Sequence, residues 1–289
     1  MEPCGRKKYP FGRTGRTFFA AVFGACLLFS SFPVRAEAGL EIVVEEIDGE
    51  LTIVRSTGSA KELEIPENIN NIPITAIGPL AFARRGLERV VIPGSITAIG
   101  DSAFSGNSIT AVIIGEGVTV IGRGAFSGNR IAELAMGERV TEIGKGAFAY
   151  NRLGGVTIPE GVVTIGDFAF LDNHIAALTI PESVTYIGRG AFSGNRIADA
   201  VIGGGVAEVG DGAFFNNRVN RVTIPPALMT LGKRAFDQVR PVRGDTIDYV
   251  DRDGTVLFTT ANNFDTYFAN NGRRPGRYTL TRTGWTLEE

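Results

Sequence analysis

Apolar and polar positions recur along this chain with a period of 22 residues. A phenylalanine marks each repeat, preceded directly by alanine and, four residues earlier, by glycine. A fixed period of this length is typical of a solenoid, in which each unit buries its apolar face against its neighbours. The pattern therefore predicts a mainly β repeat solenoid over residues 63–239. Its eight coils carry Phe82, Phe104, Phe126, Phe148, Phe170, Phe192, Phe214 and Phe236.

Each coil contains apolar residues that predict its buried side. The alternation in Val156-Thr157-Ile158 predicts a short strand with one buried face, and apolar residues such as Val162 and Ile165 recur before each phenylalanine. The glycine four positions before phenylalanine indicates either a positive φ angle or a position without room for a Cβ atom. An asparagine three positions after phenylalanine is expected to bond turn backbone groups that would otherwise be buried unpaired. It occurs as Asn107, Asn129, Asn151, Asn173, Asn195 and Asn217.

Both ends of the repeat region depart from the period. Residues 37–62 predict an N-terminal cap hairpin that turns at Asp48-Gly49. Residues 240–289 predict a C-terminal cap, with hairpins over 247–258 and 278–287 and a short helix over 264–271. Such caps would cover the open ends of the apolar core.

Residues 1–36 have the pattern of a secretory signal peptide, with a basic start and an apolar run from Phe18 to Phe32. The run is shorter than the roughly 20 residues that a membrane span requires. We therefore expect cleavage and no transmembrane span in the mature chain, with lipidation of Cys26 as the alternative. Both cysteines, Cys4 and Cys26, lie in this segment. The exported domain would then have neither disulfides nor thiolate metal sites.

The charge balance and the single histidine exclude several classes of function. Removing residues 1–36 takes six basic residues and one acid from totals of 29 and 31, which leaves 23 basic and 30 acidic residues and a net charge of −7. A nucleic-acid partner is disfavoured, because such partners are met by net basic surface. His174 lies in a repeat column and has no cysteine partner, so histidine-based catalysis and a zinc site are disfavoured. We expect a non-enzymatic protein without a cofactor or metal.

The repeat units resemble a known family. The segments IPEGVVTIGDFAFLDNHIAALTIP and IPESVTYIGRGAFSGNRIADAVIG are similar to BspA-type leucine-rich repeats of bacterial surface proteins, most closely the treponemal members. The tail FDTYFANNGRRPGRYTLTRTGWT resembles the ending of such treponemal proteins. The resemblance implies an exported leucine-rich-repeat protein, in the periplasm, at the outer-membrane surface or secreted, that attaches to host or neighbouring-cell components.

One departure from the usual leucine-rich pattern affects the expected sheet. That pattern places Asn or Cys three residues after the third apolar strand position, where this chain has residues such as Ser95, Gly117 and Arg139. A discontinuous sheet is therefore an open alternative to one smooth parallel sheet.

The outward positions of the predicted strands form an apolar patch on the early coils. Outward residues of a solenoid sheet are free to vary, because they do not hold the coils together. The patch has two explanations: strand propensity or cover by the N-terminal cap, and a binding site. As a site it would serve a protein or extracellular-matrix partner or, alternatively, a small hydrophobic ligand in the periplasm or at the surface. Its members are Val91, Ala111, Ile113 and Ala135.

A second candidate is a basic column directly after the asparagines. Like charges stacked at a spacing of about 4.8 Å repel one another. Either acids such as Glu133 and Asp199 neutralise the column, or the column binds an anionic partner such as a sulfated glycan or an acidic protein. The column three positions before phenylalanine mostly alternates in sign, which indicates cross-coil pairing instead. The basic column consists of Arg130, Arg152, His174, Arg196 and Arg218.

A third candidate is the tripeptide Arg243-Gly244-Asp245, which integrins read when an exposed loop presents it. The sequence leaves open whether this loop is exposed, which partner binds and which oligomeric state forms.

Overall fold

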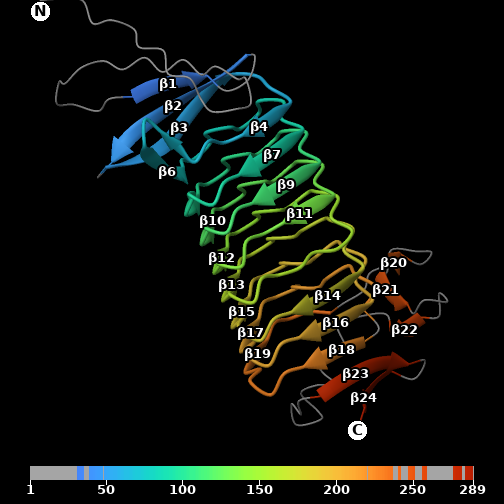
Figure 1. Ribbon diagram of the computed structural model, residues 1–289. Helices are drawn as coiled ribbons and strands as arrows, with labels where there is room; N and C mark the ends of the chain where they lie inside the picture. The colour runs from blue at the N-terminus through green and yellow to red at the C-terminus, as the bar shows by residue number, and fades with distance from the viewer. Residues whose placement is uncertain are drawn as a thin grey trace, which may run out of the picture.

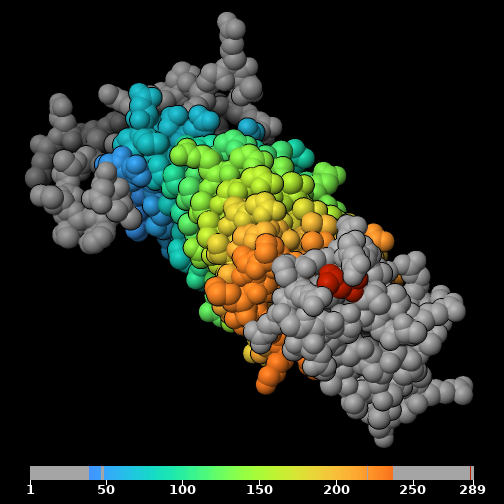
Figure 2. Space-filling view, turned by 90° about the horizontal axis from the view of Figure 1, so that it is seen from below, coloured from blue at the N-terminus to red at the C-terminus, as the bar shows by residue number. Residues whose placement is uncertain are grey.

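The computed structural model is a β-solenoid of eight coils, stacked in chain order along one elongated body (Figures 1 and 2). No helix occurs among the residues that the structure describes. This confirms the predicted fold class. The description covers residues 31–35, 39–47, 49–219, 221–236, 240–241, 247–250, 256–258, 276–281 and 284–288.

One long side of the solenoid is a 12-stranded sheet. From β8 onward each strand is only two residues long and pairs in parallel with the equivalent strand of the next coil. In addition, β5 (Asn68–Ile69) pairs with β6 off the main path. The order across the sheet is β1 (Ser31–Arg35), β2 (Leu40–Ile47), β3 (Glu50–Gly58), β6 (Ile72–Ile77), β8 (Ala98–Ile99), β10 (Val120–Ile121), β12 (Glu142–Ile143), β13 (Thr164–Ile165), β15 (Tyr186–Ile187), β17 (Glu208–Val209) and β19 (Thr230–Leu231).

The other long side consists of two separate sheets (Figure 1). The first comprises β4 (Glu62–Glu64), β7 (Arg89–Ile92), β9 (Ala111–Ile114) and β11 (Glu133–Ala135). The second comprises β14 (Ala177–Ile180), β16 (Asp199–Ile202), β18 (Arg221–Ile224), β23 (Gly276–Thr281) and β24 (Gly284–Glu288).

The break between these sheets falls on the coil that contains residues 153–158, which form no strand. The predicted strand over Val156-Thr157-Ile158 is therefore wrong, although Ile158 is buried. Gly154 and Gly155 precede it directly, and glycine weakens a strand because it adds backbone entropy and no side chain to pack. A Cβ atom at either glycine would meet nothing within 4 Å, so neither is required by close packing. The sheet is discontinuous at this coil.

The N-terminal end of the solenoid is closed by an antiparallel hairpin of β2 and β3, joined at residues 48–49. Because β3 pairs in parallel with β6, the hairpin continues the long sheet. The extra residues of the first coil turn between β5 and β6, where Asn70 and Asn71 have φ angles of 52° and 66°. Strand β1 lies inside residues 1–36, so signal cleavage at that point would remove it.

The described part of the C-terminal region also contains antiparallel strands. β23 pairs with β18 and forms a hairpin with β24, in which Leu280 lies opposite Trp285. A three-stranded sheet contains β20 (Arg240–Pro241), β21 (Ile247–Val250) and β22 (Val256–Phe258). The helix expected over 264–271 and the tripeptide 243–245 lie outside the described residues.

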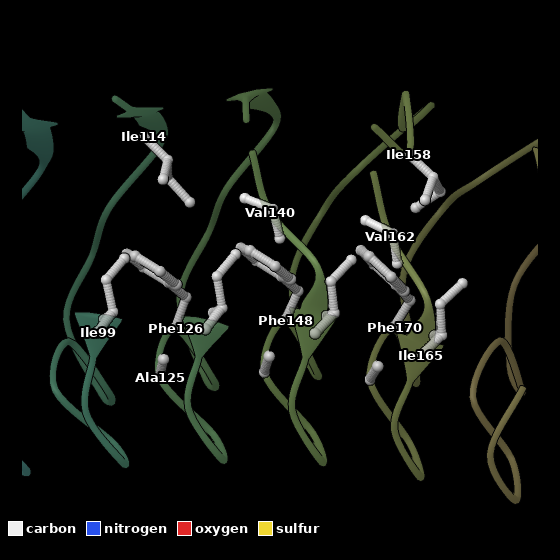
Figure 3. Close-up of a cluster of buried hydrophobic side chains, with 14 of the residues drawn as sticks. Ile99, Ile114, Ala125, Phe126, Val140, Phe148, Ile158, Val162, Ile165 and Phe170 are labelled. Carbon is white, nitrogen blue, oxygen red and sulfur yellow. The ribbon is translucent and has the colours of Figure 1, made fainter. Parts of the chain in front are cut away.

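The eight phenylalanines form one continuous stack through the core, of which Figure 3 shows Phe126, Phe148 and Phe170. Successive ring centroids are 4.9 to 5.5 Å apart, and the ring planes differ by 0 to 13°. Every ring is at most 2% exposed. Burial of such a side chain contributes about 1.5 to 3 kcal/mol, so the stack is a principal source of stability.

The asparagines form a second ladder beside the rings, and the structure confirms the predicted role of their amides. Asn151 Nδ2 donates to the carbonyl oxygens of Phe126 and Phe148 at 3.0 and 3.1 Å, and its Oδ1 accepts from the Ile131 amide at 3.0 Å. One side chain thus bonds backbone groups of two coils. Each buried group left unpaired would cost about 1 to 3 kcal/mol.

The glycine four positions before phenylalanine is explained by close approach. Gly144 donates to the Ile121 carbonyl at 2.8 Å, and a Cβ atom on Gly144 would lie 2.7 Å from that same oxygen. None of the eight glycines of this column has a positive φ angle. The left-handed conformation occurs instead two residues before phenylalanine, as at Gly146 with φ 63°.

Two alanine substitutions in one coil separate close approach from backbone conformation. Gly144→Ala should lower the free energy of unfolding by at least about 3 kcal/mol, because its Cβ meets neighbouring backbone that cannot move independently. Gly146→Ala should cost only about 1 to 2 kcal/mol, because its Cβ meets only Ala149 Cβ at 4.0 Å and only the φ angle is strained. Urea unfolding of both variants measures the difference. Equal losses would contradict this account of the column.

Candidate partner-binding face

The predicted apolar patch lies on one face of the first sheet. Ile113 is paired in register with Val91 of β7 on one side and with Ala135 of β11 on the other. Ala111 is two residues before Ile113 on β9 and faces the same way. Ile113 is 43% exposed, so no cap segment among the described residues covers it. The structure thus places the four patch residues side by side on an open surface.

A groove of about 660 Å³ crosses this face where the sheet breaks. Ala111, Ile113 and Ala135 contribute to its lining, whereas Val91 stands beside it in the register with Ile113. Sequence reasoning missed the groove, because it predicted a continuing strand where the Gly154-Gly155 pair interrupts the sheet. That pair was the available signal. The full lining is Arg89, Ala111, Val112, Ile113, Ala132, Glu133, Leu134, Ala135, Gly155, Val156, Thr157 and Ala177.

The basic column forms an exposed ridge, which we call the arginine ridge and define as Arg130, Arg152, His174, Arg196 and Arg218. Each residue is held through its backbone amide, which donates to the preceding coil at 2.9 to 3.0 Å. Among the described residues no ion pair involves these side chains. Asp199 pairs instead with Arg221 at 3.1 Å. The ridge therefore keeps its positive charge on the described surface.

The ridge and the groove share coils. Arg130 lies three residues before Glu133, where β11 begins, and Arg152 lies three residues before Gly155, which lines the groove. A partner that covers the groove at these coils therefore meets positive charge at the starts of the same segments.

The sign-alternating column, three positions before each phenylalanine, makes the predicted cross-coil contacts, but mostly not between side chains. Lys145 and Asp167 are the ion pair found there among the described residues, at 3.8 Å. In three other steps the carboxylate accepts from the backbone amide of the next coil instead of pairing with its side chain. These bonds join Asp101 Oδ1 to Arg123 N (2.8 Å), Asp167 Oδ1 to Arg189 N (2.9 Å) and Asp211 Oδ1 to Lys233 N (2.7 Å).

Two side chains on the solenoid have shifted proton affinities. A hydrogen bond from Lys61 Nζ to Glu88 at 2.7 Å, together with the negative charge of that carboxylate, raises the pKa of Lys61. Burial raises the pKa of Tyr186, and the charges of Asp167 and Glu208 add to the effect. Neither group lines the groove.

Few groups on the described surface suit metal binding or membrane insertion. In the described part of the chain no three His, Cys, Asp or Glu side chains are placed to hold one metal ion. Nor does that part contain a helix with the length and hydrophobicity to cross a membrane. The geometry offers a recognition surface of apolar groups and exposed cations.

The repeat pattern identifies the family. The sequence profile described as BspA type leucine rich repeat region (6 copies) matches residues 75–198 and 130–243. This chain therefore belongs to the BspA-type leucine-rich repeat proteins, a family of scaffolds without catalytic machinery of its own. No curated protein matches the chain.

Solved structures of several leucine-rich repeat proteins are similar to this solenoid. A leucine-rich repeat protein from Bacteroides ovatus is 23% identical with a TM-score of 0.55, and the match covers 71% of this chain and 56% of that chain. A leucine rich cell surface protein from Faecalibacterium prausnitzii is 23% identical over 70% of this chain and 73% of that chain, with a TM-score of 0.42. The T. pallidum leucine rich repeat protein is 23% identical over 64% and 74%, with a TM-score of 0.39. At these identities the likeness concerns the fold.

Proposed function

We propose that this protein is an exported scaffold that binds a protein of the host or of a neighbouring cell through the groove and the arginine ridge. The observation that carries the proposal is an open apolar groove next to cations that no described acid neutralises. A partner segment with an apolar side chain and nearby carboxylates would satisfy both surfaces at once. The signal-peptide pattern of residues 1–36 supports export. The sequence of the repeat units supports a treponemal origin.

The second candidate is a site for a small hydrophobic ligand, which the apolar lining of Ile113, Leu134 and Val156 favours. Ligand pockets of that kind bury 70 to 90% of the ligand surface. This groove is open to solvent, and Arg89 and Glu133 also line it. A protein partner fits better, because it brings its own surface to cover the groove.

Replacing Ile113 tests the groove. Ile113→Asp should weaken binding to immobilised extracellular-matrix proteins at least tenfold, because a partner would bury the new carboxylate without a counter-charge. Val163→Asp is the matched control, since Val163 is also 43% exposed but does not line the groove. Surface plasmon resonance on both folded variants gives the affinities. Equal losses of affinity in both variants, or no loss in either, would show that the groove is not part of the binding face. If Ile113→Asp keeps protein binding but no longer takes up an apolar fluorophore, the small-ligand alternative is favoured.

Charge reversal tests the arginine ridge. Arg152→Glu should weaken binding to the same proteins and flatten the dependence of affinity on salt, because an exposed attractive charge is screened by added ions. Arg123→Glu changes net charge equally but lies outside the ridge and should have little effect. The affinities are measured between 50 and 300 mM salt, over which the Debye length falls from about 13 to about 6 Å. A salt dependence that neither variant alters would contradict a role for the ridge.

Protease treatment of intact cells tests the proposed location. An attachment protein must be accessible from outside, so added protease should digest it while a periplasmic marker stays intact. Immunoblotting measures both proteins. Complete protection in cells with a sealed outer membrane would contradict attachment and favour the periplasmic binder.

A further inference from the structure

A second recess lies away from the groove, just beyond the carboxyl ends of β13, β15, β17 and β19. Its volume is about 320 Å³, and it is as open to solvent as the groove, so a ligand would be covered on one side only. We call it the corner pocket. It is lined by Phe168, Arg189, Gly190, Ser193, Asp211, Gly212, Phe215, Lys233 and Arg234.

The walls of the corner pocket are departures from the repeat. Two residues before each core phenylalanine the backbone is left-handed in every coil, with φ angles of 55 to 63°. Glycine suits that conformation and occupies the column at Gly190 and Gly212. Phe168 and Arg234 occur in the same column with φ 57°, where a side chain is strained, and they stand on either side of the two glycines. Leu80 and Ser102 are also left-handed in this column, so the type of side chain at Phe168 and Arg234 distinguishes the pocket, not the backbone strain.

The corner pocket lies over the coil that contains Gly190 and Ser193, and each of the two neighbouring coils contributes an aromatic side chain to it. Phe168 rests against Gly190, where a Cβ atom would come within 2.6 Å of the ring. Phe215 occupies a column that holds serine at Ser105, Ser127 and Ser193. Both rings are half-buried. The recess therefore depends on these two aromatic residues and on the glycine between them.

The aromatic rings hold cations at the rim. Arg189 Cζ lies 5.9 Å from the centroid of the Phe168 ring, and Arg234 Cζ lies 4.6 Å from that of Phe215. Stacking on an aromatic face orients a guanidinium, so Arg189 can present its N–H groups to a carboxylate or sulfate. With Lys233, three basic side chains and one acid, Asp211, line the pocket. Asp211 Oδ1 is already engaged with the Lys233 amide.

From this arrangement we infer that the corner pocket binds an acidic sugar unit, a saccharide ring that carries a carboxylate or sulfate. Arg189 and Lys233 would take the anionic group, and Ser193 and the second oxygen of Asp211 would bond ring hydroxyls. The parts of the half-buried rings that the cations leave uncovered would contact C–H groups of the sugar. A purely apolar ligand would leave the charges desolvated, and a simple inorganic anion would not use the aromatic walls.

The chain contains its own control for this inference. The segment IGRGAFSGNRI occurs at residues 121–131 and again, identical, at residues 187–197. Arg189 belongs to the second copy, which lies between the coils of Phe168 and Phe215. Arg123 holds the same place in the first copy, where the flanking coils have Ser102 and Ala149 instead of the aromatic residues. The two arginines share their local sequence and differ in their neighbours.

Calorimetric titration of the full-length protein tests the corner pocket with four probes: a glucuronate-containing tetrasaccharide, a sulfated tetrasaccharide, a neutral N-acetylglucosamine tetrasaccharide and inorganic sulfate. At least one acidic tetrasaccharide should bind saturably, and the neutral one and sulfate at least tenfold more weakly. Arg189→Gln should weaken binding at least tenfold, and Arg123→Gln less than twofold.

Two further variants restore the residues of neighbouring coils. Phe168→Gly and Phe215→Ser should each reduce affinity at least tenfold, while the thermal unfolding midpoint of Phe168→Gly stays near that of the parent because glycine removes the φ strain. Ile113→Asp should bind the tetrasaccharide normally, which keeps this result independent of the groove. Equal losses in Arg123→Gln and Arg189→Gln, equal binding of sulfate or of the neutral sugar, or no binding of any probe would overturn the inference.

Discussion

The direct contact of each coil with the next is the constraint on which the rest of the structure depends. At the glycine before each phenylalanine, two backbones approach so closely that no Cβ atom fits between them. That approach brings the aromatic rings to stacking distance and lets one asparagine amide bond two coils. Because the glycine and phenylalanine contacts must align in every coil, and the asparagine contact in six of them, an inserted residue would disrupt the alignment with both neighbours. The unbroken period of the repeats follows from this requirement.

Much of the fold was predictable, because the buried columns recur at the same spacing with little change in residue type. The phenylalanines, asparagines and alternating strand positions each appear in many copies, and each copy supports the same assignment. The glycine column allowed two explanations, which only backbone geometry could separate. The strand at Val156-Thr157-Ile158 was predicted wrongly since its alternation matches that of the other coils. Gly154 and Gly155 made the difference, because they contribute no side chains that could pack in a strand.

The candidate sites were predictable only in part, because surface function depends on neighbours that are 22 or 44 residues away in sequence. The apolar patch could be found from the outward strand positions, and its neighbours Val91, Ile113 and Ala135 do lie in register. The groove could not be predicted, because it depends on the break in the sheet. The acids at positions 101, 167 and 211 were expected to pair with side chains; all three accept from backbone amides, and among them Asp167 also forms an ion pair, with Lys145. Sequence columns show proximity and do not show which atoms meet.

The two identical segments have a consequence for how such a protein can change over time. They begin at Ile121 and Ile187, 66 positions or three whole coils apart. A recombination event that joined the first copy to the second would delete three coils and leave every ladder in register. The shortened protein would lose Gly154, Gly155 and Phe168 together. Strand β9 would then adjoin β16, so a single exchange would convert a broken sheet into a continuous one without changing any core contact type.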